Sequence, residues 1–214
     1  MTGAAQATLV DRGAGMVYDT VLNITVLKDW NLAKTSNFAG ADSTGAMNWD
    51  TATSWASDLV FAGYSDWRLP TSLNQDGNTC LAYNCSGSEL GQIWHVGLGN
   101  VAGSFSNSGP FANMQPGLYW TSTSYPNPWN PVAFGVDNGY QSSMGGSGYL
   151  EFAVAVRTGD VSAVPEPQTF GLMSLGLLVV AGATLRRRMT KQSAPQNSVM
   201  VQSERRNVTC APPG

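Results

Sequence analysis

The stretch "GYSDWRLPT", residues 63–71, surrounds one charged side chain with residues suited to burial. The apolar members of the stretch are Trp67, Leu69 and Pro70. Arg68 is the only basic residue between positions 34 and 157, and an arginine in an apolar run usually locks loops by bridging carboxylates or backbone carbonyls with its fixed fork of donors. We therefore expect a structural role for Arg68 rather than a ligand contact. The nearest candidate partners in sequence are Asp50, Asp58 and Asp66.

Helical patterns stand on both sides of this stretch. In "NWDTATSWASDLV", residues 48–60, apolar side chains follow the helical spacing and Asn48 is suited to be the N-cap. In "SGSELGQIWHVGLG", which starts at residue 86, Ser86 and Glu89 have the spacing of a capping box. The apolar stripe of this second helix is Leu90, Ile93 and Trp94. Two helices are therefore expected in the first half of the chain.

Most other patterned segments look like short strands, at residues 16–29, 117–124, 131–144 and 151–159. Asn138-Gly139 favours a tight hairpin turn inside the third of these segments. Helices in the first half and strands mostly in the second predict one α+β domain over residues 8–161 rather than a parallel sheet.

Charge divides the chain into two unlike parts near Val164. Before it, twelve acidic residues outnumber five basic ones, and after Leu185 six basic residues face one acid. Nucleic acid requires a lysine and arginine footprint, so we expect the acidic domain not to bind it. By the same reasoning, neutral polysaccharides are better candidate ligands for the domain than polyanionic ones.

Cys80 and Cys85 lie close together, whereas Cys210 belongs to the tail. Such a near pair is most simply a short structural disulfide of the kind that exported domains contain, with a redox pair or a metal site as the competing interpretations. The spacing is not C-x-x-C, and His95 is the only histidine, so a metal site would need two carboxylates from elsewhere. We expect a disulfide, no bound metal and no cofactor.

The segment from Thr169 to Leu185 is uncharged and long enough, at the short end, to span a bilayer as a helix. Prolines precede it, at positions 165 and 167, and three arginines follow it, at positions 186 to 188. Basic residues at one end of such a helix orient that end toward the cytoplasm. We therefore expect a transmembrane helix over 169–185 with the domain outside.

Pro165, Glu166 and Pro167, followed by this apolar stretch and then by Arg186, Arg187 and Arg188, resemble the PEP-CTERM sorting signal of Gram-negative bacteria. The resemblance implies residues 162–188 as a sorting signal processed by an exosortase, a cell-surface or matrix location, and association with exopolysaccharide and biofilm. A polar basic tail, 189–214, follows. Ala5-Gln6-Ala7 is an A-x-A triplet of the kind that closes a signal peptide, so we expect residues 1–7 to be the remnant of one.

The order of the remaining motifs is similar to that of the Lcl C-terminal domain family. The matching stretches include "NWDTATSWASDLVFAGYSDWRLPT", "YWTSTSY", "AFGVDNGYQ" and "AVAVRTGDV", which lie between Gly15 and Val161. This resemblance implies a C-type-lectin-like fold related to that of formylglycine-generating enzyme. In one branch of the family, the domain acts in adhesion to sulfated glycans.

No residue pattern in the sequence indicates a catalytic site. His95 lies in a predicted helix without a nucleophile-elbow pattern, so we expect no catalytic residue. Aromatic side chains among Asn, Ser and Gly can stack on sugar rings, and we expect candidate ligand contacts at Trp129, Tyr125 and Tyr140. Three hypotheses remain: a module that binds or structures extracellular polysaccharide, an envelope enzyme, and a structural biofilm protein without a ligand.

Overall fold

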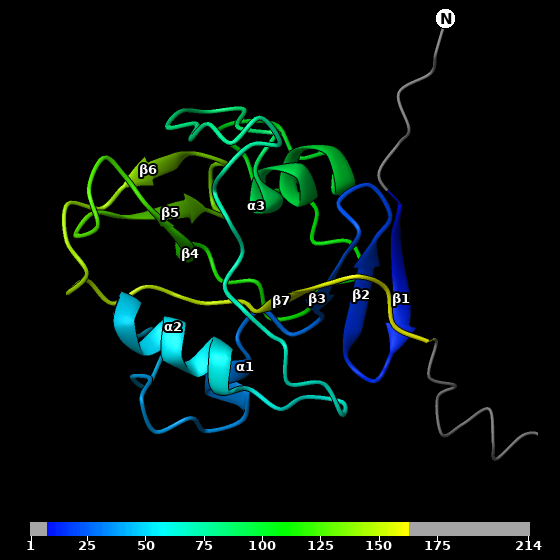
Figure 1. Ribbon diagram of the computed structural model, residues 1–214. Helices are drawn as coiled ribbons and strands as arrows, with labels where there is room; N and C mark the ends of the chain where they lie inside the picture. Colours follow the sequence, from blue (N-terminus) through cyan, green and yellow to red (C-terminus); the bar gives the residue numbers. More distant parts are fainter. Residues whose placement is uncertain (1–7, 163–214) are drawn as a thin grey trace, which may run out of the picture. The chain divides into compact units, whose positions relative to one another are not determined.

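The computed structural model describes residues 8–162 of the 214-residue chain. This part forms a mixed α+β domain with two antiparallel sheets and few helices (Figure 1). The expected α+β class is therefore confirmed. No helix within residues 8–162 is both long and apolar enough to cross a membrane, and the helix expected over 169–185 lies outside the described residues.

The first sheet has the strand order β1-β2-β3-β7. Its strands are β1 (Leu9–Gly13), β2 (Met16–Asp19), β3 (Ile24–Leu27) and β7 (Val156–Thr158). Val26 of β3 pairs with Val156 of β7, so the last strand of the domain pairs with a strand from its beginning. β1 was not predicted, because its two charged residues interrupt the apolar pattern.

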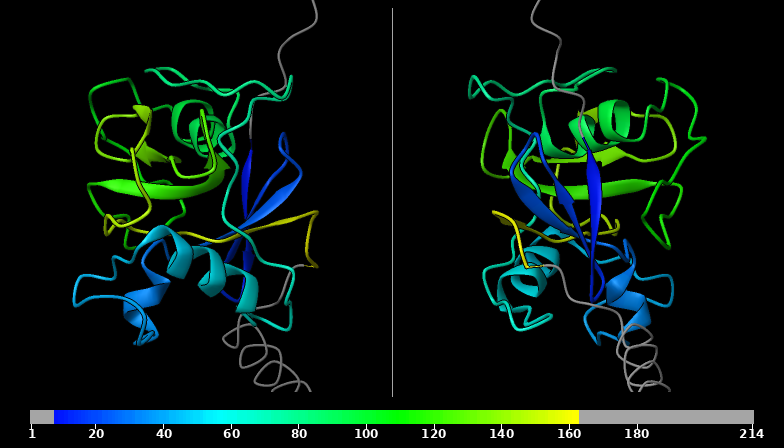
Figure 2. Two further views of the ribbon diagram at one scale, coloured as in Figure 1. Left: turned by 60° about the vertical axis from the view of Figure 1, so that its left-hand side comes forward. Right: turned by 90° about the vertical axis from the view of Figure 1, so that its right-hand side faces the viewer.

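The second sheet has the order β4-β5-β6, from β4 (Leu118–Ser124), β5 (Pro131–Gly135) and β6 (Gln141–Ser143). Ser124 pairs with Pro131 at one end of β5, and Leu118 pairs with Gly135 at the other. All five residues of β5 are buried. In Figures 1 and 2 the second sheet lies beside the first, with helices α1 (Leu32–Thr35) and α2 (Trp49–Asp58) on one side and α3 (Glu89–Gly91) on the opposite side.

The hairpin expected around Asn138-Gly139 is confirmed, since β5 and β6 pair antiparallel on its two sides, but its turn is not a tight one. Residues 136–139 form a wider loop, closed by a hydrogen bond from the Gly135 N–H to the Tyr140 carbonyl, and Gly139 has a φ of +72°. Val136, the first residue of this loop, is fully buried and its N–H donates to the Gly117 carbonyl, so the start of the loop packs in the core. At Gly139 a side chain would lie 2.5 Å from the Trp94 ring, so only glycine fits.

Helix α2 begins as expected. The Asn48 side chain accepts a hydrogen bond from the Thr51 N–H at 2.9 Å, and Trp55 packs into the core. The helix ends at Asp58 because Leu59 adopts an extended conformation. Val60, expected on the apolar face, is instead 73% exposed.

The capping box expected between Ser86 and Glu89 is also wrong. Ser88 is the N-cap of α3, and its hydroxyl accepts a hydrogen bond from the Gly91 N–H at 3.2 Å. The Glu89 carboxylate instead forms two charge-assisted hydrogen bonds to the Arg68 guanidinium. The chain continues from α3 into a π-helical turn, η1 (Gln92–Gly97). The expected apolar stripe Leu90, Ile93 and Trp94 is fully buried.

The long strand expected over residues 151–159 is confirmed only in its last part, β7. Just before β7, the backbone forms isolated β-bridges with two different segments: Glu151 pairs with Met47, and Phe152 pairs with Tyr119. Residues 153–156 are all buried. This stretch therefore runs through the core between the two sheets instead of lengthening one of them.

Candidate functional site

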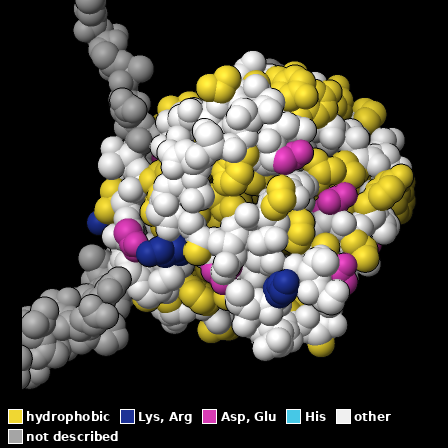
Figure 3. Space-filling model, turned by 180° about the vertical axis from the view of Figure 1, so that it is seen from behind, with side chains coloured by type: hydrophobic (Ala, Val, Ile, Leu, Met, Phe, Trp, Pro, Cys, Tyr) yellow, Lys and Arg dark blue, Asp and Glu magenta, His cyan; other side chains and the backbone are white. Residues whose placement is uncertain are grey.

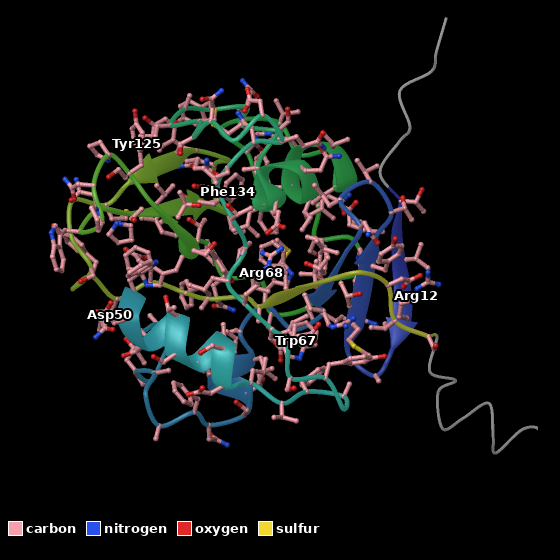
Figure 4. All side chains as sticks on the ribbon, viewed as in Figure 1. Arg12, Asp50, Trp67, Arg68, Tyr125 and Phe134 are labelled. Atoms are coloured by element: carbon pink, nitrogen blue, oxygen red, sulfur yellow. A yellow bond between two sulfur atoms is a disulfide. The ribbon has the colours of Figure 1, made fainter. Side chains whose placement is uncertain are left out.

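The segment 67–72 is hydrogen-bonded to both sheets. The Arg68 N–H donates to the Val156 carbonyl at 2.9 Å, and the Val156 N–H donates to the Arg68 carbonyl at 2.8 Å. Two residues later, the Pro70 carbonyl accepts a bond from the Ser122 N–H of β4 at 2.8 Å. Figure 4 shows Trp67 and Arg68 on this segment, where it crosses β7. The segment therefore ties the first sheet to the second.

Arg68 pairs with Glu89, not with any of the three aspartates expected from the sequence. The two guanidinium nitrogens donate to the two carboxylate oxygens at 2.7 and 2.8 Å. The Thr71 N–H donates to the same carboxylate at 2.8 Å, and the Glu89 side chain is only 10% exposed. Hydrogen bonding to Glu89 raises the pKa of Arg68, although burial acts in the opposite direction. This pair fixes α3 against the 67–72 segment.

The three aspartates are placed elsewhere by the fold. Asp66 forms two hydrogen bonds with Arg157, at 2.8 and 3.0 Å, which lower the pKa of its carboxyl. Arg157 also lies over the Tyr64 ring, 4.1 Å from its centroid. Asp50 and Asp58 line a groove of about 540 Å³ on the outer side of α2, and Figure 4 shows Asp50 well away from Arg68.

The motif Trp67-Arg68-Leu69-Pro70 thus makes structural contacts. Trp67 is 3% exposed and Leu69 is 2% exposed. The Trp67 ring N–H donates to the Tyr64 carbonyl at 3.1 Å, and the ring packs edge-on against Phe61. These residues hold the elements together rather than line an open site.

The β4–β5 loop, residues 125–130, is closed by its own hydrogen bonds. The Tyr125 N–H donates to the Asn130 carbonyl at 2.8 Å, and the Trp129 N–H donates to the Asn127 side-chain oxygen at 3.0 Å. Trp129 is 78% exposed and Tyr125 is 47% exposed. Figure 4 shows Tyr125 near the outer end of the second sheet. The loop therefore holds two aromatic side chains at the surface.

Tyr140, the third aromatic residue singled out in the sequence, lies at the other end of this sheet. Phe134 of β5 pairs with Gln141, so Tyr140 sits beyond the Gly135 end of β5, whereas Trp129 precedes the Pro131 end. The half-buried Tyr140 ring packs edge-on against Tyr83, with centroids 4.7 Å apart. Tyr83 was not among the ligand contacts predicted from the sequence, although its position between the two cysteines could have indicated it.

The disulfide between Cys80 and Cys85 is confirmed, with Cα atoms 5.6 Å apart. The loop that it closes is bonded to β6. The Gln141 N–H donates to the Ala82 carbonyl at 3.0 Å, and the Gln141 side-chain amide donates to the Cys80 carbonyl at 2.6 Å. The disulfide therefore fixes a loop that lies along the edge of the second sheet.

His95 is half-buried in η1 beside Trp94. Its ring nitrogen lies 3.3 Å from the Gly139 carbonyl oxygen, and its ring meets Trp94 and Phe134 edge-on. Burial lowers the pKa of His95, and hydrogen bonds to the backbone at Gly139 and Asn100 partly offset that effect. In the part of the chain from 8 to 162, no three His, Cys, Asp or Glu side chains are grouped so as to hold a metal ion.

A structural disulfide such as Cys80–Cys85 is typical of proteins that fold in an oxidising, extracytoplasmic compartment. The model of the Lcl C-terminal domain matches residues 15–158, and the chain belongs to this family. The PEP-CTERM protein-sorting motif matches residues 163–188 and implies export, exosortase processing and sorting to the cell surface. No curated protein and no solved structure matches the chain.

Proposed function

We propose that the exported domain binds or structures extracellular polysaccharide at the cell surface or in the surrounding matrix, and that the β4–β5 loop makes the main contact. The observation that carries this proposal is the exposure of Trp129, at 78%, on a loop closed by its own hydrogen bonds. An indole ring offers a large apolar face on which the C–H face of a sugar ring can stack. Because the loop is already ordered, little conformational entropy is lost on binding.

The charges of the domain favour a neutral polysaccharide. Within residues 8–162, four of the five basic residues are engaged in ion pairs with acidic partners: Arg12, Lys28, Arg68 and Arg157. On the face shown in Figure 3, charged side chains are few and are scattered among hydrophobic and uncharged polar ones. A polyanion would meet an acidic domain with little free positive charge, which disfavours its association.

The proposed arrangement is C-type-lectin-like, as the family resemblance implies. Two small antiparallel sheets and few helices are compatible with it, and long ordered loops carry the exposed aromatic residues. In this proposal, residues 169–185 anchor the protein in the inner membrane of a Gram-negative bacterium until an exosortase processes the sorting signal. The domain is a binding or structural module, and we assign it no catalytic residue.

The test is affinity electrophoresis of the full chain in mild detergent, in gels containing dextran, galactomannan or mixed-linkage β-glucan. We expect retardation in at least one of these gels, and Trp129→Ala should weaken binding about tenfold because it removes one stacking surface. Tyr149→Ala, at an exposed tyrosine outside the loop, is the matched control and should bind like the parent. Equal binding by Trp129→Ala would contradict the assignment of the loop, and no retardation of the parent in any gel would favour a structural protein without a ligand.

A further inference from the structure

The disulfide loop presents a second pair of aromatic rings, at the end of the second sheet opposite to Trp129. We propose that Tyr83 and Tyr140 form a separate contact surface for a neutral saccharide, and that the Cys80–Cys85 disulfide holds this surface in shape. The inference rests on the proposed function, since it adds a second site for the same class of ligand.

The two tyrosines are placed by backbone pairing as well as by ring contact. Tyr83 and Tyr140 form an antiparallel bridge, and their rings meet at an interplanar angle of 61°. Tyr83 is 49% exposed, so one ring is supported by its neighbour while much of its surface faces solvent. Such a supported ring is held ready for a ligand at low cost in side-chain entropy.

The loop that carries Tyr83 is fixed from two directions. The disulfide joins its ends, with a sequence separation of five residues. Beneath it, the fully buried Gln141 side chain donates to the Cys80 carbonyl at 2.6 Å and to the Ser72 carbonyl at 3.2 Å. Without the disulfide, the Gln141 bonds to Cys80 and Ala82 and the ring contact between Tyr83 and Tyr140 would be left to hold the loop along this edge. The position of Tyr83 is therefore expected to depend on the oxidised state of the cysteines.

The free polar groups at this surface suit sugar hydroxyls. Among the described residues, the hydroxyls of Tyr83 and Tyr140 form no hydrogen bond, whereas the hydroxyl of Tyr18 donates to Asn23 and that of Tyr119 accepts from the Gln115 N–H. Neither the loop 80–85 nor the segment 136–144 contains a basic residue. The surface thus combines apolar ring faces with uncharged hydroxyls, which matches a neutral saccharide better than an anionic one.

The separation of the two surfaces makes them independent contacts. They flank β5, whose five residues correspond to roughly 15 Å of extended chain. A long polysaccharide that reaches both surfaces gains avidity, because the second contact forms at a high effective concentration. Loss of either surface should therefore weaken binding without abolishing it.

The test uses the same gels and the full chain. Tyr83→Ala should weaken binding to the retarding neutral polysaccharide about fivefold to tenfold, Tyr83→Phe should weaken it less than threefold, and Tyr149→Ala should have no effect. Thermal melting should show that the Tyr83 variants fold as the parent does. The double variant Cys80→Ser/Cys85→Ser should bind as weakly as Tyr83→Ala while remaining sensitive to Trp129→Ala.

The outcomes separate this inference from the proposed function. Weakened binding by Trp129→Ala together with parental binding by Tyr83→Ala would overturn the second surface and leave the β4–β5 loop in place. Parental binding by the cysteine double variant would overturn the role of the disulfide. Retardation of the parent in none of the neutral gels, or only in an additional gel that contains the polyanion polygalacturonate, would overturn both proposals.

Discussion

Two segments that each contain a tryptophan and a proline have opposite positions in this domain. Trp67 lies three residues before Pro70 and is 3% exposed, whereas Trp129 directly follows Pro128 and is 78% exposed. The 67–72 segment is hydrogen-bonded to β7 and to β4, while the backbone bonds of the β4–β5 loop run mostly within the loop. The sequence around each tryptophan already favoured these positions, and the tertiary hydrogen bonds of the 67–72 segment hold Trp67 in the core.

The largest effect that this comparison predicts is at Trp67. Trp67→Ala removes a buried ring and leaves a cavity between elements that the segment ties together, so it should lower the free energy of unfolding by about 3 to 5 kcal/mol. Denaturant unfolding of the variant checks the value. Any loss of polysaccharide binding should follow the loss of fold, and a Trp67→Ala variant as stable as the parent would remove the basis of the comparison.

The next effect concerns the charge pair that fixes the 67–72 segment. Glu89→Gln leaves the Arg68 guanidinium without a charged partner in a half-buried position, and we expect a loss of about 2 to 3 kcal/mol in the free energy of unfolding. Asp50→Asn is the matched control, because Asp50 lies on the outer groove of α2 and should change stability by less than about 0.5 kcal/mol. Equal melting of the two variants would show that the pair contributes little.

The disulfide should have a smaller effect on stability than the Arg68–Glu89 pair. Cys80→Ser/Cys85→Ser opens a short ring, for which the loss of chain constraint corresponds to about 2 kcal/mol or less. Denaturant unfolding of this variant, beside the parent under non-reducing conditions, measures the difference. A loss as large as that of Trp67→Ala would mean that the disulfide supports the whole core rather than one surface loop.

The smallest effect on stability is expected at Trp129. Because its ring is exposed, Trp129→Ala should change the free energy of unfolding by less than about 0.5 kcal/mol while weakening saccharide binding. Melting measured on the same preparation that is used in the gels checks this. If Trp129→Ala melted well below the parent, its ring would have a packing role and the contrast with Trp67 would fail.

Arg68 and Arg157 show what could not be predicted from the sequence. A structural role for Arg68 followed from its apolar surroundings, but its partner did not, since Glu89 is 21 residues away and resembled part of a capping box. Arg157 lies 91 residues from Asp66, which is the aspartate nearest to Arg68 in sequence. Each arginine pairs with the carboxylate that the fold places opposite its guanidinium group. The distance between two residues in the sequence does not predict this placement.

The sequence by itself determined the α+β class, the Cys80–Cys85 disulfide and the sorting motif, because each depends on residue types at short spacing. Only the tertiary structure decided that Trp129 and Tyr140 lie at opposite ends of one sheet and that Tyr83 supports the latter. The physical reason is that strand register and loop closure depend on contacts between residues far apart in the chain, and these contacts decide which aromatic rings remain open to a ligand.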